Sequence, residues 1–169
     1  MPYTETNFLV DHTNITDTIN RLWWSVDRQD WDAILKRVFA EDITADYTAL
    51  FGGQPEEVKA TKQVAVFKGL LEALDSAQHA NMTVLVDLPQ ADEDASPPTE
   101  VKANCNSVTS LVRKSAEGGP ISNGGGYYDY VLIRDTSVSK GQNPWRIKYM
   151  KAYFSWITGN QHVLPGVKE

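Results

Sequence analysis

The sequence predicts one α+β domain, in which N-terminal helices pack against a curved and mostly antiparallel sheet. The first observation is element order, because segments with helical spacing fill the first half of the chain and strand-like segments fill the second. The second is length: 169 residues are about one domain's worth and can bury a core without disulfides. The third is that two loop-like segments, 89–100 and 118–126, each lie between strand-like runs. A sheet wrapped around the helices and open at one end would form a cone-shaped α+β barrel that encloses a pocket.

Three helices are predicted in the first half. The first begins with Thr13 or Asn14 as N-cap and has an apolar stripe at helical spacing, made of Ile15, Ile19, Leu22 and Val26. After a break at residues 28–29, Asp30 can cap a second helix, which would bury Trp31, Ile34, Leu35 and Val38. The third helix is expected over residues 61–74, with its buried stripe at Val64, Phe67, Leu71 and Leu74.

Five strands are predicted from alternation and from β-branched and aromatic content. A short one covers residues 43–47, between the second and third helices, and two more alternate over 82–86 and 101–107. Residues 127–134 and 145–156 are richer in aromatic residues, so both faces of these long strands are expected to be occupied. We therefore expect a single domain over residues 12–160, with an N-terminal tail at 1–11 and a C-terminal tail at 161–169.

Composition and charge exclude several classes of function. A net charge of −6 and a pI near 5.0 argue against a nucleic-acid binder, which needs a basic surface for the phosphates. A single cysteine, Cys105, excludes an intrachain disulfide, and no histidine, cysteine or carboxylate spacing suits a metal, so neither a metal nor a cofactor is expected. No run is long enough to span a membrane and no secretory signal is visible, which predicts a cytoplasmic protein without membrane partners.

Three residues could carry acid–base chemistry. Asp27 lies at the edge of the first apolar stripe, near a helix C-terminus, where its carboxylate either meets solvent or turns inward to a partner. His79 lies between the third helix and a strand expected to begin near Asn81, and it is either a structural residue or a base at the rim of the cavity. Neutral imidazole can take a proton from a weakly acidic carbon, and a carboxylate on the other ring nitrogen would fix the tautomer. Tyr47 is expected to point inward, where backbone, water or a substrate oxygen would satisfy its hydroxyl.

Other residues could line a pocket for a flat, apolar or cyclic small molecule. On the third predicted strand Asn104 and Asn106 face opposite to Cys105, and on the next strand Tyr128 and Tyr130 face opposite to their neighbours. Parity alone leaves open which faces point into the pocket, and we predict that both pairs bind substrate. The aromatic residues Trp23 and Phe67 are also predicted to line the pocket and bind substrate.

Several segments together resemble the SnoaL-like family of the nuclear-transport-factor-like superfamily, which includes polyketide cyclases, scytalone dehydratase and ketosteroid isomerase. The likeness covers roughly residues 12–160 and is carried by Val26–Ile34 (VDRQDWDAI), Phe39–Asp42, Asp46–Tyr47, Gln78–His79, Gly126–Tyr130, Trp145–Ile147, Trp156 and Gly159. The opening Asp-x-x-Asp-Trp-Asp with a later histidine is moderately specific for this family.

The resemblance implies a deep apolar pocket and an aspartate–histidine pair, and Asp27 and His79 fall on those two positions. Tyr47 matches a tyrosine that polarises the substrate carbonyl. This chain departs from scytalone dehydratase at its partner tyrosine (Val26), its second histidine (near Leu111) and its strand serine and asparagine (near Tyr130 and Leu132), so the machinery that expels water is incomplete.

The resemblance thus implies a cofactor-independent isomerase, cyclase or dehydratase for a polyketide- or terpenoid-like carbonyl compound of secondary metabolism. His79 would be the base, Asp27 would orient it, and Tyr47 would stabilise the enolate. The rival interpretation is a non-catalytic ligand-binding or dimerisation module, and an epoxide-hydrolase-type site ranks last because no Asp-Arg-Asp set is visible. By the same resemblance we expect a homo-oligomer, either a dimer or a trimer.

Overall fold

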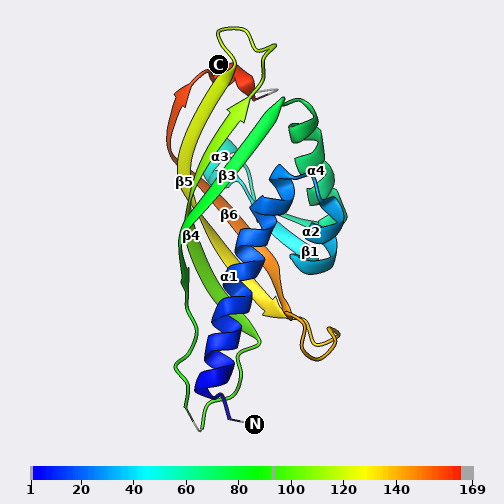
Figure 1. The fold of residues 1–169 in the computed structure, drawn as a ribbon, viewed down its shortest axis with the longest axis vertical. Coiled ribbons are helices and arrows are strands. Elements are labelled where there is room, and N and C mark those ends of the chain that lie inside the picture. The colour runs from blue at the N-terminus through cyan, green and yellow to red at the C-terminus, as the bar shows by residue number, and fades with distance from the viewer. Residues whose placement is uncertain (1, 93, 165–169) are drawn as a thin grey trace.

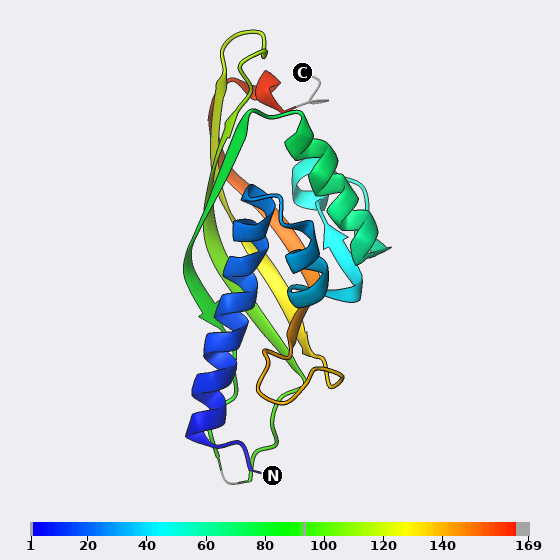
Figure 2. The same cartoon turned by 45° about the vertical axis from the view of Figure 1, so that its right-hand side comes forward.

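The computed structural model describes residues 2–92 and 94–164 and confirms the predicted α+β class. Its helices are α1 (Glu5–Asp27), α2 (Trp31–Arg37), α3 (Thr48–Phe51), α4 (Ala60–Glu72) and the 3₁₀ helix η1 (Gln161–Val163). Its strands are β1 (Phe39–Asp46), β2 (Glu56–Lys59), β3 (Ser76–Val86), β4 (Glu100–Val112), β5 (Ile121–Arg134) and β6 (Trp145–Gly159). The strands form one curved sheet in the order β2-β1-β6-β5-β4-β3, and α1, α2 and α4 lie along one side of it (Figures 1 and 2). The β1–β6 pair is parallel and the others are antiparallel.

Helix α1 begins earlier than predicted. Its N-cap is Thr4, whose hydroxyl accepts from the backbone N–H of Asn7 at 3.2 Å while the Asn7 side chain accepts from the N–H of Thr4 at 3.2 Å. The caps predicted at Thr13 or Asn14 and the predicted tail at 1–11 are therefore corrected. The predicted helix began too late because the apolar stripe starts only at Ile15. In the first turns of α1 the buried residue is an aspartate, Asp11, instead of an apolar side chain.

The second and third predicted helices are confirmed as α2 and α4, with smaller corrections. Asp30 caps α2 as expected, accepting from the N–H of Ala33 at 3.0 Å. Leu35 is 36% exposed and Trp31 and Leu74 are only half-buried, because α2 is short and α4 ends at Glu72. The short elements β2 and α3 were not predicted, since four residues carry too little periodicity.

Strands β1, β3, β4 and β5 start earlier than the sequence indicated, whereas β6 begins at Trp145 as predicted. Strand β3 begins at Ser76, so His79 lies inside a strand and not at a junction. Residues 121–126 of the glycine-dense segment belong to β5, where the main chain of β6 approaches Gly126 so closely that any side chain would collide with the carbonyl oxygen of Tyr153. The strand expected at 43–47 is β1, and Tyr47 follows it as the N-cap of α3.

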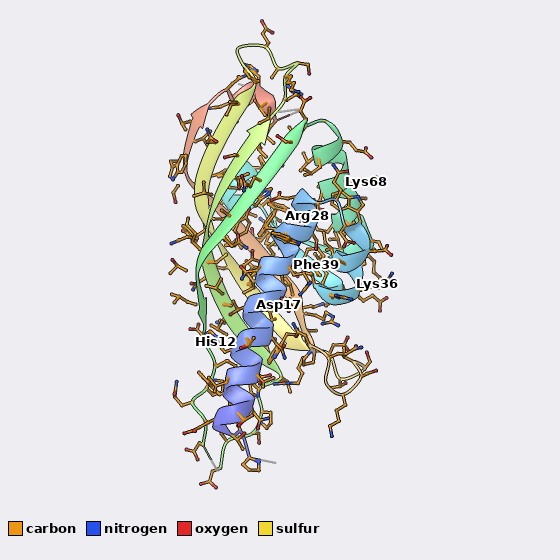
Figure 3. The ribbon with its side chains drawn as sticks, viewed as in Figure 1. His12, Asp17, Arg28, Lys36, Phe39 and Lys68 are labelled. Carbon is orange, nitrogen blue, oxygen red and sulfur yellow. The ribbon has the colours of Figure 1, made fainter. Side chains whose placement is uncertain are left out.

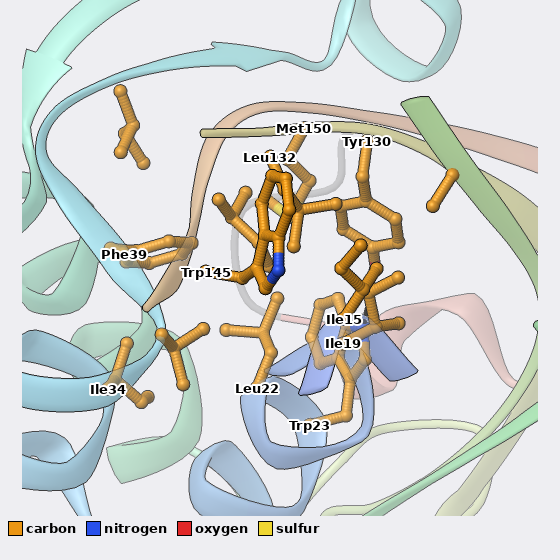
Figure 4. Close-up of a cluster of buried hydrophobic side chains, with 14 of the residues drawn as sticks. Ile15, Ile19, Leu22, Trp23, Ile34, Phe39, Tyr130, Leu132, Trp145 and Met150 are labelled. Atoms are coloured by element: carbon orange, nitrogen blue, oxygen red, sulfur yellow. Dashed lines mark hydrogen bonds between the residues drawn. The ribbon is translucent and has the colours of Figure 1, made fainter. Parts of the chain in front are cut away.

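The core lies between α1 and the concave face of the sheet (Figure 4). Residues of α1 meet residues of β5 and β6 there, and the largest of them are fully buried: Ile15, Ile19, Leu22, Tyr130, Leu132, Trp145 and Met150. At the C-terminal end Val163 of η1 is also buried, which corrects the tail predicted from residue 161, while residues 165–169 of that tail lie outside the described residues. None of the described helices is both long and apolar enough to cross a membrane.

Candidate acid–base site

Asp27 and His79 meet where the C-terminus of α1 packs against β3. The Oδ1 atom of Asp27 lies 2.6 Å from Nδ1 of the imidazole, and Oδ2 accepts from the backbone N–H of His79 at 2.6 Å. The side chains are only 17% and 10% exposed, respectively. A carboxylate only accepts hydrogen bonds, so in the neutral imidazole Nδ1 carries the proton and Nε2 presents a lone pair. One carboxylate thus fixes both the position and the tautomer of the ring.

An aromatic cluster packs against the imidazole through the indole of Trp23. The indole of Trp23 stacks on it with ring centroids 4.4 Å apart and an interplanar angle of 22°. Phe67 and Tyr128 pack against the same indole at 5.7 Å and 5.0 Å. The Nε1–H of Trp23 donates to the Tyr130 hydroxyl at 3.1 Å, so the indole is held in place at its far end. Of these four predicted pocket residues, Trp23 contacts His79 and lines the cleft beside it, whereas Phe67, Tyr128 and Tyr130 contact Trp23.

The buried hydroxyls of Tyr47 and Tyr128 remain protonated at neutral pH. Burial raises the pKa of Tyr47 and of Tyr128 well above the ordinary value. The Tyr47 hydroxyl accepts a hydrogen bond from Nε2 of the buried Gln63 at 2.9 Å, which leaves its own O–H proton available for donation. Gln63 was missed by the sequence analysis because a glutamine on the apolar stripe of a helix carries no motif.

Other candidates occupy different roles. Tyr130 is 1% exposed and lies beside Cys105. Burial raises the pKa of the Cys105 thiol to about 11, so Tyr130 and Cys105 are both core residues. Asn104 and Asn106 are exposed on the face of β4 opposite to Cys105, which corrects their assignment as pocket residues. The error has a simple origin: side chains alternate along a strand, and which face meets the helices depends on a register that the sequence does not reveal.

A cleft of about 610 Å³ borders the aspartate–histidine pair. It lies between the C-terminal half of α1 and strands β3 and β4, and its lining includes Trp23, Asp27, His79 and Asn81. The exposed ring of Trp24 also lines it, with the guanidinium carbon of Arg28 4.1 Å from the ring centroid. Figure 3 labels Arg28, which directly follows α1. Within residues 2–92 and 94–164, no cluster of three or more histidine, cysteine or carboxylate side chains could hold a metal ion.

A comparison with protein families matches residues 7–151 to the SnoaL-like domain. Among solved structures, the fold is similar to a protein assigned as a scytalone dehydratase from Novosphingobium aromaticivorans, at 17% identity over 90% of this chain and 89% of that one, with a TM-score of 0.67. It is also similar to the hexachlorocyclohexane dehydrochlorinase LinA-type3 from Novosphingobium barchaimii, at 12% identity over 97% of each chain, with a TM-score of 0.70. A nuclear transport factor 2-like protein from Salmonella enterica matches at 18% identity over 91% and 97%, with a TM-score of 0.59.

At these identities the likeness establishes the fold, which this chain shares with dehydratases and dehydrochlorinases. A search of the curated proteins found no match.

Proposed function

We propose that this chain, which belongs to the SnoaL-like domain family of the NTF2-like superfamily, is a cofactor-independent acid–base enzyme. Its reaction would be an isomerisation, cyclisation or dehydration of a polyketide- or terpenoid-like carbonyl compound in secondary metabolism. The observation that carries the proposal is the 2.6 Å contact between Asp27 Oδ1 and His79 Nδ1, made by two poorly exposed side chains on a cleft. A carboxylate that orients a neutral imidazole is an arrangement suited to general-base catalysis.

The proposed reaction begins with proton transfer to His79. Its Nε2 lone pair removes a proton from the carbon next to a substrate carbonyl, and the electron pair moves onto the carbonyl oxygen to form an enolate. Asp27 offsets the positive charge that the imidazole acquires. The Tyr47 hydroxyl, whose oxygen already accepts from Gln63, donates to the enolate oxygen. The proton then returns from His79 to another carbon or to a leaving hydroxyl.

The test is exchange of the α-hydrogens of a panel of small cyclic ketones, including 1-tetralone, in D₂O, followed by proton NMR. We expect the wild type to accelerate exchange for at least one ketone and His79→Ala to reduce that rate by about 10²–10⁴-fold. The matched control is His12→Ala, because His12 is an exposed histidine on α1, remote from β3 in sequence. Exchange that survives His79→Ala in a folded variant would overturn the proposed mechanism.

A non-catalytic ligand-binding module is the second candidate. It is favoured by the stacking of Trp23 on the imidazole at 4.4 Å, because the indole, together with Phe67 and Tyr128, occupies space next to the ring. If the wild type binds ketones but accelerates the α-hydrogen exchange of none of them, the protein is a ligand-binding module and the proposed enzyme activity is rejected.

A further inference from the structure

Two buried polar atoms on the concave face have no hydrogen-bond partner among the described residues. One is Oγ of Ser107 on β4, a residue that is 4% exposed. The other is Oδ1 of Asn81 on β3, whose Nδ2 donates to the Ile19 carbonyl at 3.4 Å. Burying such atoms unpaired is costly, and folded proteins rarely do so without a reason. A polar pair in this position therefore indicates a binding site for a small polar group.

The two atoms belong to neighbouring positions of the sheet. Asn81 and Ser107 are direct partners in the antiparallel β3–β4 register, so their side chains point to the same face. That face is the inner one, because Ser107 continues the buried alternation of β4. Opposed side chains on such a pair start about 4.5–5.5 Å apart, so one small group can contact both.

The pair lies close to the proposed base. His79 precedes Asn81 by two residues on β3 and points to the same face, which places the two side chains about 6.4–6.8 Å apart along the strand. Asn81 and His79 also border the same cleft of about 610 Å³. A molecule that presents a carbon to His79 can therefore reach Asn81 and Ser107 with a group at the other end of one six-membered ring.

The chemistry of the two atoms selects that group. Oδ1 of Asn81 is an amide oxygen and can only accept, while the Asn81 amide nitrogen is directed to the Ile19 carbonyl. The Ser107 hydroxyl can both donate and accept. A partner must therefore donate to Asn81 and exchange a hydrogen bond with Ser107, which a hydroxyl group does. A carbonyl or carboxylate oxygen would leave Asn81 unpaired.

We propose that Asn81 and Ser107 form a hydroxyl-binding subsite, so that the carbonyl compound handled by His79 also carries a hydroxyl group about one ring away from the reacting carbon. This inference rests on the proposed function for the reaction, but the subsite itself is a statement about binding. A hydroxyl can come from the substrate or from an ordered water, and the test separates the two sources.

The test compares 6-hydroxy-1-tetralone with 6-methyl-1-tetralone, which differ by a hydroxyl against a methyl group at one position. Dissociation constants are measured by titration followed with ¹H–¹⁵N NMR. We expect the wild type to prefer the hydroxy compound by about tenfold. Ser107→Ala and Asn81→Leu should each remove the preference by weakening binding of the hydroxy compound, while the methyl compound binds as before.

Asn106→Ala is the matched control, because Asn106 is adjacent to Ser107 on β4 but exposed on the other face, and it should keep the preference. Ser107→Ala removes an unpaired hydroxyl, so it should fold with unchanged or higher thermal stability, and it remains informative if Asn81→Leu fails to fold. Equal affinity of the wild type for both compounds, or a preference that survives Ser107→Ala, would overturn the subsite. Equal affinity with a loss of stability in Ser107→Ala would identify a structural water instead.

Measuring the same two constants in His79→Ala separates this inference from the proposed function. A hydroxyl preference that persists without α-hydrogen exchange in any variant would leave the subsite standing and reject the enzyme. Exchange that depends on His79, without any preference for the hydroxy compound, would support the enzyme and reject the subsite.

Discussion

The carboxylate of Asp27 uses one oxygen for the imidazole of His79 and the other for the backbone N–H of the same residue. The ring is therefore held relative to its own main chain, which leaves little freedom for rotation about the side-chain bonds. An asparagine in place of Asp27 keeps the size of the side chain but can donate to Nδ1, which would move the proton to Nε2 and abolish its lone pair.

Asp27→Asn is thus expected to reduce α-hydrogen exchange by about 10²–10⁴-fold, while a ketone ligand still binds. The tautomer is read from the ¹⁵N chemical shifts of the His79 ring. Asp32→Asn, which changes an exposed carboxylate of α2, should leave both the rate and the ring shifts unchanged. A wild-type rate in Asp27→Asn would mean that the contact only supports the fold.

Tyr47 offers a second test of the proposed mechanism, because Gln63 donates to its oxygen and leaves its proton free. Tyr47→Phe should lower the exchange rate by about 10²-fold through loss of one donor to the enolate. Tyr127→Phe, on an exposed tyrosine that stacks on Tyr153 at 4.3 Å, is the control and should keep the wild-type rate. Equal rates in both variants would contradict the role given to Tyr47.

Individual residues differ in how far the sequence reveals them. Asp27, His79 and Tyr47 were singled out as candidates because their residue types suit acid–base chemistry and because they fall on family positions. Gln63, Asn81 and Ser107 were missed, since their significance comes from burial and from cross-strand pairing, which depend on the three-dimensional register. Asn104 and Asn106 were chosen wrongly for the same reason.

The end of β1 is joined to β6 and α3 by one buried carboxylate. Asp46 accepts from the Thr48 hydroxyl at 2.6 Å, from the Tyr149 hydroxyl at 2.7 Å, and lies 3.3 Å from Nζ of Lys151. Burial alone would raise the pKa of Asp46, but these hydrogen bonds outweigh it and lower the pKa to about 2. The ionised carboxylate is therefore the form that stabilises this junction.

Because folding depresses the pKa of Asp46, its carboxylate stabilises the folded chain at pH values above the ordinary pKa of about 3.8. This stabilisation is lost as the pH falls toward 2. Asp46→Asn should lower the free energy of unfolding at pH 7, and its stability should change less than that of the wild type between pH 4 and 2. Urea unfolding at several pH values measures both effects. The control is Asp32→Asn, and parallel pH profiles for wild type and Asp46→Asn would show that Asp46 contributes no such linkage.

At the level of elements, long periodic segments were predicted well and their ends were not. The stripe of α1 and the Asp30 cap of α2 follow from local sequence, whereas the first turns of α1, which begin after the N-cap Thr4, are held to the sheet by contacts of Asp11 that are distant in sequence. Strand β3 starts at Ser76 because it pairs along its length with β4, a partner that no local pattern identifies.

One ion pair joins the N-terminal half of α1 to the strands at that end of the molecule. Asp11 accepts from Arg134 of β5 at 2.6 Å and from the Trp145 indole of β6 at 2.9 Å, and its side chain is 6% exposed. Removing a buried carboxylate leaves its partners unpaired. The segment that the sequence suggested as a tail is therefore part of the folded body.

Asp11→Ala is expected to lower the free energy of unfolding by about 3 kcal/mol, measured by chemical denaturation. Asp17→Ala on the same helix breaks a half-exposed pair with Arg21 and should cost less than about 1 kcal/mol. If the two variants lose the same stability, Asp11 does not hold the helix to the sheet.

The pairing of β1 with β6 sets a condition on how the chain reaches this shape. These two strands lie side by side and parallel, although about one hundred residues separate them in the chain (Figure 1). A nascent chain on the ribosome has completed β1 long before its neighbour emerges, and closing so long a loop is slow. Until β6 has left the exit tunnel, one edge of β1 remains without its partner strand, so the sheet closes only after all the intervening elements have been synthesised.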